Sequence, residues 1–222
     1  LITLTKANGA TWHYEYDGNS NLTREVNPLG KDVRYFYDEA GHLVHTRFSD
    51  DIYYGFDYDG NGNLTQKNDP YGSVTYTYDA LNRLTTVSDD VGTIGAYGYD
   101  AASRRITASN AANQTTVFTY DAANRLTAVT DPLGHSTAFT YDAASNRLST
   151  IDALGRTNSV VYDALNRPIG LVDANSKQTQ VVYDVVGQIT QLIAPTGATT
   201  TFTYDARGLQ TNITNPLNQQ TT

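Results

Sequence analysis

The sequence predicts an all-β fold in which antiparallel hairpins of about 21 residues repeat and form one continuous curved, spiralling sheet. Three observations predict it. The dipeptide Tyr-Asp recurs ten times, strand-forming residues alternate before each copy, and Gly or Asn recurs shortly after it. No stretch of the chain has convincing helical periodicity, so the repeating unit is expected to contain strands and turns alone.

The Tyr-Asp dipeptide recurs at a constant step, and only the step from Tyr58 to Tyr78 is shorter, by a single residue. A fixed period of this size is typical of repeat proteins, in which each unit packs on its neighbours. The ten tyrosines are Tyr16, Tyr37, Tyr58, Tyr78, Tyr99, Tyr120, Tyr141, Tyr162, Tyr183 and Tyr204. Because no linker interrupts them, we expect residues 1–222 to form a single array of ten repeats, with no second domain, that belongs to a longer array.

Each Tyr-Asp is expected to close a strand. A large aromatic or β-branched residue stands two positions before every tyrosine, and the residue between them is often Thr. These large residues are Tyr14, Tyr35, Phe56, Tyr76, Tyr97, Phe118, Phe139, Val160, Val181 and Phe202. Apolar and polar residues that alternate in this way indicate a strand. Since side chains alternate across a strand, the large residue and the tyrosine lie on the same face.

A hairpin turn is expected directly after each Tyr-Asp. The residues there are short and polar, as in Ala122-Ala123-Asn124, and Gly or Asn recurs at one offset. Both residues tolerate positive φ, which such turns require. The aspartate can accept hydrogen bonds from the turn amides, as in Asx turns. The ten aspartates are Asp17, Asp38, Asp59, Asp79, Asp100, Asp121, Asp142, Asp163, Asp184 and Asp205.

A second strand and a second turn complete the unit. In the strand Arg125–Val129, the apolar residues Leu126 and Val129 are three apart, which predicts a bulge or partial burial of both faces. The segment Asp131-Pro-Leu-Gly134 suits a type I or type II turn. Two strands of about six residues and two turns of about four account for the repeat, so ten repeats predict about 20 strands.

Three departures from the repeat are visible. Asn146 is expected to lengthen the first turn of its repeat by one residue, and Pro168 is expected to weaken the pairing of its strand. Phe48 and Ala194 stand where other second turns have Asp or Asn.

A sheet of about 20 strands cannot stay flat, because strands twist and open sheets beyond about ten strands curl, split or close. We therefore expect a ribbon that winds into a spiral or a wall. The 17 tyrosines of the chain fit a thin sheet. A tyrosine ring can pack against the next repeat while its hydroxyl stays hydrated or hydrogen-bonded.

Composition excludes several function classes. The net charge of -8 argues against a nucleic-acid partner and against docking on an acidic membrane surface. The chain has no Cys, which excludes disulfides and thiolate metal sites. No apolar run approaches the length of about 18 residues that a membrane-spanning helix needs, so no membrane span is predicted.

No catalytic or metal site is predicted, and we expect neither a cofactor nor an enzyme. The paired aspartates at 50–51 and 89–90 lack a calcium-loop pattern, and no Gly-x-Ser-x-Gly nucleophile motif occurs. The histidines share no spacing with a metal motif, which favours solvated surface positions. They are His13, His42, His45 and His135.

The remaining polar and aromatic rows have two interpretations each. Arg83, Arg125 and Arg147 are expected to pair with nearby aspartates, although such a row could also bind an anionic sugar or partner. The aromatic rows are expected to pack between repeats, with glycan binding as the alternative.

The run Tyr120-Asp-Ala-Ala-Asn-Arg-Leu-Thr127, followed by Asp131-Pro-Leu-Gly134, resembles the YD repeat of bacterial RHS (rearrangement hot spot) proteins, toxin-complex cocoons and animal teneurins. The resemblance extends over essentially Tyr14–Thr222. It implies a hollow shell of spiralling β-sheet, which in bacterial members encloses a toxic C-terminal domain. The resemblance therefore implies a structural segment of a secreted bacterial shell, at the cell surface or outside the cell, whose partner is the toxin or cargo domain of its own chain.

Two further points follow from the resemblance. Bacterial shells of this family carry an aspartyl self-cleavage site, but here His135 follows Gly134 in place of the expected Leu and the rest of the segment is absent, so no protease residue is assigned. The alternative function is an extracellular adhesin or filament that binds glycans or other cells. Exposed strand edges would allow such a chain to associate with itself.

Overall fold

The computed structural model describes residues 2–221, which form 22 β-strands and no helix. The chain divides into two compact units, the first ending at Thr115 and the second beginning at Thr116, and each is described separately. No helix that could cross a membrane occurs within residues 2–221.

The strands of the first unit are β1 (Ile2–Thr5), β2 (Thr11–Tyr16), β3 (Leu22–Val26), β4 (Asp32–Tyr37), β5 (Leu43–Phe48), β6 (Tyr53–Tyr58), β7 (Leu64–Asp69), β8 (Gly72–Tyr78), β9 (Leu84–Asp89), β10 (Thr93–Tyr99) and β11 (Arg105–Asn110). β12 (Thr115–Tyr120) begins at the boundary. The second unit continues with β13 (Leu126–Thr130), β14 (Ser136–Tyr141), β15 (Arg147–Ile151), β16 (Thr157–Tyr162), β17 (Pro168–Val172), β18 (Gln178–Tyr183), β19 (Ile189–Ile193), β20 (Thr199–Tyr204), β21 (Gln210–Thr214) and β22 (Gln220–Thr221).

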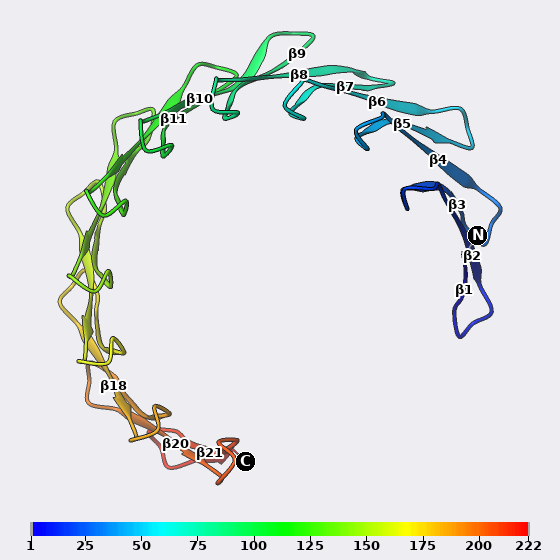
Figure 1. Cartoon of the computed structure of the whole chain (residues 1–222). Coiled ribbons are helices and arrows are strands. Elements are labelled where there is room, and N and C mark those ends of the chain that lie inside the picture. Colours follow the sequence, from blue (N-terminus) through cyan, green and yellow to red (C-terminus); the bar gives the residue numbers. More distant parts are fainter. Residues whose placement is uncertain (1, 222) are drawn as a thin grey trace. The chain divides into compact units, whose positions relative to one another are not determined.

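Within each unit, every strand pairs antiparallel with the strands before and after it in the chain, and Figure 1 shows these neighbours in chain order. The ten predicted repeats are the hairpins from β2–β3 to β20–β21, with β1 and β22 beside them. The prediction of an all-β fold made of repeated antiparallel hairpins is therefore confirmed. The predicted curvature and spiral stay a prediction.

Both turns of a repeat use one hairpin loop. In the first turn, the amide of Asp121 donates to the carbonyl of Arg125 over 3.0 Å, and the amide of Asn124 donates back to the carbonyl of Asp121 over 3.1 Å. Asn124 has a φ of 64°. The second turn repeats these bonds from Asp131, with Gly134 at a φ of 87°. The left-handed residue is the fourth residue of the turn, whereas a type II turn has its positive φ at the third residue. The turn is therefore type I, as in three-residue hairpin loops.

Two second turns are shorter. Asp69 pairs directly with Gly72, which accounts for the shortened step between Tyr58 and Tyr78. The amide of Asp89 likewise donates to the carbonyl of Gly92 over 2.9 Å. In this second case, β10 restores the period through a register shift between Thr93 and Gly95.

The prediction that Asn146 lengthens its turn is wrong. The amide of Asp142 donates to the carbonyl of Asn146 over 3.0 Å, so this loop has the ordinary length. The strand gains no residue either, because β15 has the same length as β13 and Arg147 stands opposite Tyr141 in the place that Leu126 occupies one repeat earlier. Ser145 adopts the left-handed conformation at the fourth position of this turn. This conformation costs less than a longer loop would, because the flanking ladder stays in register.

A bulge precedes the tyrosine in each hairpin. Thr119 pairs with Ala128 and Tyr120 pairs with Leu126, so Thr127 is the extra residue of the second strand. The predicted bulge is confirmed. Between consecutive hairpins the ladder is short. From β13 to β14 it joins three residue pairs, beginning at the return loop and ending at Ala128 and Ala138.

The sheet has an aromatic face, defined by the ten tyrosines and the large residues two positions before them. The opposite face carries threonines that bond across strands, as between the hydroxyls of Thr119 and Thr127 at 3.1 Å. No second layer covers either face. Val181, 8% exposed, is the only buried hydrophobic side chain among residues 2–221. Stability therefore depends on contacts within one layer.

Two glycines test the loop geometry. Gly30 has a φ of 75°, Gly18 has no positive φ, and a Cβ added to either would have no atom within 4 Å. We expect Gly30→Ala to lower the free energy of unfolding by about 1 kcal/mol, because an L residue is strained in the left-handed region. Gly18→Ala is the matched control and should be neutral or slightly stabilising. Urea unfolding measures both, and equal effects would contradict the assigned loop.

Candidate functional site

The ten predicted aspartates all begin a hairpin loop. In the loop of Asp121, one carboxylate oxygen accepts hydrogen bonds from the amides of Ala123 and Arg125, each over 2.9 Å. Loop amides have no ladder partner, so the side chain satisfies them. The amide of Arg125, followed by its guanidinium, holds the pKa of Asp121 below its ordinary value, because hydrogen bonds to the ionised form favour it.

The residue four positions after the aspartate extends this arrangement to the next repeat. Arg125 donates from Nε to the second carboxylate oxygen of Asp121 over 2.7 Å. Its Nη1 donates to the backbone carbonyl of Asp142 over 2.6 Å, and its guanidinium lies 4.8 Å from the centre of the Tyr141 ring. We call this set of three side chains, Asp, Arg and the next tyrosine, the repeat clasp.

The repeat clasp recurs with different residues. Arg83 pairs with Asp79 at 2.6 Å, donates to the carbonyl of Asp100 over 3.0 Å and lies 4.8 Å from the Tyr99 ring. Arg167 pairs with Asp163 and lies 4.6 Å from the ring of Tyr183 in the same way.

His42 replaces the arginine in the first unit. Its Nδ1 lies 2.9 Å from the carboxylate of Asp38, and its ring stacks on Tyr58 with centroids 4.7 Å apart. Arginine and His42 therefore share a flat, hydrogen-bonding side chain that lies on the next tyrosine ring. Other repeats have Asn, Gln or Leu at this position, namely Asn21, Asn63, Asn146, Gln188 and Leu209.

The predicted arginine row is only partly correct. Arg83 and Arg125 pair with the aspartates of their own loops. Arg147 does not, because Asn146 occupies the loop position and donates to Asp142 over 2.8 Å. Arg147 instead lies in the strand with its guanidinium 5.7 Å from the Phe139 ring. Arg104 and Arg167, which the sequence analysis did not single out, hold the expected positions; their spacing from Tyr-Asp was the available signal.

The tyrosine hydroxyls join consecutive hairpins. Tyr141 donates to the carbonyl of Leu126, the first residue of the preceding hairpin's second strand, over 2.8 Å. Equivalent bonds run from Tyr37 to Leu22 (2.9 Å), Tyr58 to Leu43 (3.0 Å), Tyr78 to Leu64 (2.9 Å), Tyr99 to Leu84 (2.9 Å), Tyr162 to Arg147 (3.2 Å), Tyr183 to Pro168 (3.0 Å) and Tyr204 to Ile189 (2.8 Å).

The position of this carbonyl explains the bond. The ladder between β13 and β14 ends at Ala128, two residues from Leu126, so the Leu126 carbonyl lies beyond the last paired residues. The phenol hydroxyl supplies the partner that the neighbouring strand no longer offers. Partial burial raises the pKa of Tyr37, Tyr58 and Tyr78 above the ordinary value, which keeps the donor protonated.

Other titratable side chains form ion pairs outside the repeat clasps, as Arg24 does with Glu15 at 3.0 Å and with Asp32 at 3.1 Å. His135 pairs with Asp131 at 2.9 Å in a second turn, and His13 contacts the hydroxyl of Thr3 at 3.2 Å. No group of three or more His, Cys, Asp or Glu within residues 2–221 is arranged to hold a metal ion. The arrangement holds repeats together.

Comparison with known proteins places this repeat in a family. The RHS repeat pattern matches residues 1–32, 16–51, 58–94, 99–135, 120–157, 162–199 and 183–220. The chain belongs to the RHS repeat family. No curated protein gives a match to its sequence.

Solved structures share the fold of this RHS repeat chain. The crystal structure of TcdB2-TccC3-Cdc42 matches with a TM-score of 0.70 at 15% identity, over 96% of this chain and 13% of that one. TcdB2-TccC3 matches with a TM-score of 0.54 at 16% identity, over 96% and 15% of the two chains. TcdB2-TccC3 without its hypervariable C-terminal region gives 0.52 at 14% identity, over 96% and 14%. This RHS repeat chain thus spans a small part of the chains it resembles.

The tyrosine bond can be tested at Tyr37. We expect Tyr37→Phe to lower the free energy of unfolding by about 1 kcal/mol, because the Leu22 carbonyl loses its donor. Urea unfolding followed by the fluorescence of Trp12, the one tryptophan, measures it. Tyr71→Phe is the matched control, since Tyr71 is 92% exposed and its hydroxyl has no hydrogen bond to residues 2–221. A neutral Tyr37→Phe would contradict the role of the hydroxyl.

The aspartates predict acid sensitivity. The guanidinium of Arg83 is the main cause that lowers the pKa of Asp79 in the folded state, and the other loop aspartates with lowered pKa are Asp17, Asp38, Asp59, Asp100, Asp121, Asp131, Asp142, Asp152, Asp163 and Asp205. The unfolded chain binds more protons below about pH 4, so this stability is present above that pH and is lost as the pH falls through the folded values.

Urea midpoints measured from pH 7 to pH 2.5 test this linkage. The difference between the wild type and Asp79→Asn should shrink below about pH 4, because the wild-type carboxylate then becomes protonated too. Asp50→Asn is the control, since the Asp50 side chain makes no hydrogen bond or ion pair with residues 2–221. A difference that stays constant down to pH 2.5 would contradict a role for the ionised form.

Proposed function

We propose that this chain is a segment of the wall of a secreted bacterial RHS shell that encloses a toxin or other cargo. The observation that carries the proposal is that, within each unit and among residues 2–221, each hairpin bonds to the hairpins next to it in the chain, through ladders, tyrosine hydrogen bonds and repeat clasps. Such an array grows in one direction by adding hairpins and remains a single layer. A layer of this kind divides one space from another, which is the task of a wall.

Three further observations support a container more than an enzyme. Many of the titratable side chains are engaged in loop contacts, repeat clasps or other ion pairs. The chain belongs to the RHS repeat family, and this membership supports the comparison with shells that enclose a cargo. One similar structure is a TcdB2-TccC3 form without a hypervariable C-terminal region. By analogy, the partner of this wall is a variable cargo domain at the C-terminal end of its own parent chain, exported with it to the cell surface or the medium.

The full parent protein provides the test. Electron microscopy of the purified protein should show an enclosed cavity with density for the C-terminal cargo. Limited proteolysis should spare that cargo until the shell is unfolded in urea. A matched parent protein that ends with the repeats should form the same shell with an empty interior. An open ribbon, a filament, or a cargo that is digested as fast as the free domain would reject the container and favour the adhesin.

A further inference from the structure

One place on the aromatic face of the second unit departs from the repeat. Eight of the ten positions two residues before the tyrosine are aromatic, and the two exceptions, in consecutive repeats, are Val160 and Val181. Val181 is buried at 8% exposure. Val160 lines a hollow of about 300 Å³, at the lower end of the range of ligand pockets. A valine in place of the phenylalanine found at position 139 leaves this volume unfilled.

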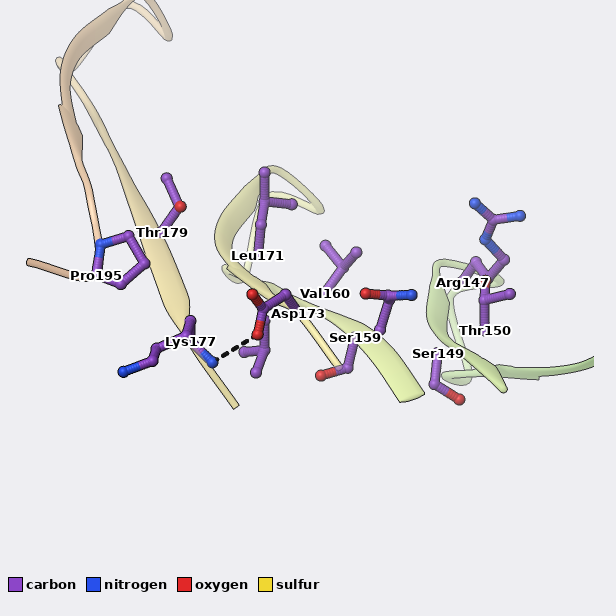
Figure 2. A pocket seen from close by; sticks show the side chains of 12 residues that line it. Arg147, Ser149, Thr150, Ser159, Val160, Leu171, Asp173, Lys177, Thr179 and Pro195 are labelled. Atoms are coloured by element: carbon purple, nitrogen blue, oxygen red, sulfur yellow. Dashed lines mark hydrogen bonds between the residues drawn. The ribbon is translucent and has the colours of Figure 1, made fainter. Parts of the chain in front are cut away.

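The floor and rim of this hollow, which we call the Val160 hollow, come from neighbouring strands. Val160 stands opposite Leu171, and Leu171 stands opposite Thr179, so the three side chains share one face. Figure 2 shows Val160 and Leu171 pointing into the same space, with Ser149 and Ser159 pointing the other way. Leu171 is 45% exposed. The rim also carries three polar side chains that can form hydrogen bonds, those of Thr150, Asn158 and Thr179.

Two cations border the Val160 hollow and lack a carboxylate partner. Arg147 lies in the strand, at the position that Leu126 holds one repeat earlier, and Lys177 lies four residues after Asp173 in a second turn. The backbone amide of Lys177 donates to Asp173 over 2.8 Å, as the dashed line in Figure 2 shows. Neither the Lys177 ammonium nor the Arg147 guanidinium forms an ion pair within residues 2–221. With Asp173 included, the lining keeps an excess positive charge in a chain of net charge -8.

We propose that the Val160 hollow binds an extended polypeptide segment that carries a large apolar side chain with a carboxylate two positions away on either side, because alternate side chains of an extended segment point to the same side. The apolar side chain would cover Leu171 and fill the space above Val160, which hydrophobic burial favours. The flanking carboxylates would pair with Arg147 and Lys177, and the rim of Thr150, Asn158 and Thr179 offers partners to peptide groups. This inference concerns one site in the second unit and does not depend on the container function.

Other ligand classes fit less well. Sugars stack on exposed aromatic rings, and the Val160 hollow is the place where the ring is missing, while Arg147 lies over the neighbouring Phe139. A nucleic acid carries a charge on every phosphate and would meet more repulsion from the net charge of -8 than a peptide whose two carboxylates face two cations. An acidic peptide with one apolar anchor satisfies both the charge and the shape of the hollow.

The binding test uses the whole chain and a fluorescein-labelled peptide of sequence Gly-Glu-Ser-Phe-Ser-Glu-Gly, followed by fluorescence anisotropy. Two comparison peptides replace both Glu by Lys, or Phe by Ala. We expect the first peptide to bind at least about tenfold more tightly than either comparison, and its affinity to fall as salt screens the charges.

Matched variants return the hollow to residues that other repeats carry. V160F restores the ring of Phe139 and should weaken binding at least about tenfold, because it occupies the anchor position. R147L restores the residue found at Leu126, and K177Q removes the second charge. Each variant should weaken binding about threefold, because each removes one partly exposed charge. V161T is the control, since it restores the Thr119 and Thr140 type on the opposite face, and it should bind like the wild type.

Several results would overturn the proposal. They are equal binding of the three peptides, V160F binding like the wild type, or tighter binding of a polygalacturonate oligosaccharide than of the acidic peptide. Circular dichroism and thermal melting establish that each variant folds. If V160F fails to fold, NMR measurement of the wild-type amide resonances during peptide titration locates the binding site instead. Peptide-induced shifts should centre on Thr150, Val160 and Leu171, and shifts spread over both faces would contradict the site.

Discussion

The hydrogen bond from a tyrosine hydroxyl to the carbonyl of the preceding hairpin is the interaction on which the rest depends. The ladder between hairpins stops near the return loop, and no second layer presses the hairpins together. An isolated hairpin is marginal in water, so the seam between hairpins decides whether the sheet exists. At that seam, Tyr141 closes the end that backbone pairing leaves open at Leu126. Without it, each pair of hairpins would be hinged at one end only.

The arginine and aspartate complete the same seam from the loop side. A hydrophobic core would bring hairpins together without fixing their orientation, whereas Arg125 contacts the loop of its own repeat, the next loop and the next tyrosine ring. Its planar guanidinium can make these contacts at once, which an ammonium cannot. Lys177 illustrates the difference in a second turn, because its side chain forms no ion pair with Asp173 within residues 2–221, whereas Arg156 in the second turn of the preceding repeat pairs with Asp152 at 2.6 Å. The chain thus depends on directional polar contacts for the stability that proteins of two or more layers obtain from a hydrophobic core.

Most of the fold could be predicted because its causes are local. The alternation before Tyr120, the left-handed residue Asn124 and the bulge after Leu126 all lie close together in the chain. The tyrosine bond could not be predicted, because its acceptor is a backbone carbonyl of the preceding hairpin whose freedom depends on where a ladder ends. The strand position of Arg147 was also hidden, since the Asn-Arg pair at 146–147 resembles the pair at 124–125 but lies one residue further from its Tyr-Asp. The loss of the ring at Val160 was visible, but its consequence needed the register of the neighbouring strands.

Nearest-neighbour bonding has a consequence for how such a chain can vary in length. The seam at one repeat makes the same bonds as the seam at the next, because a loop carbonyl, a ring and a carboxylate recur with every hairpin. Deleting or duplicating one whole unit between equivalent points would therefore rejoin compatible surfaces, while a change of a few residues would turn side chains to the wrong face. The length of the polypeptide can therefore change in steps of one whole hairpin, and the size of any assembly built from it can change in the same discrete steps.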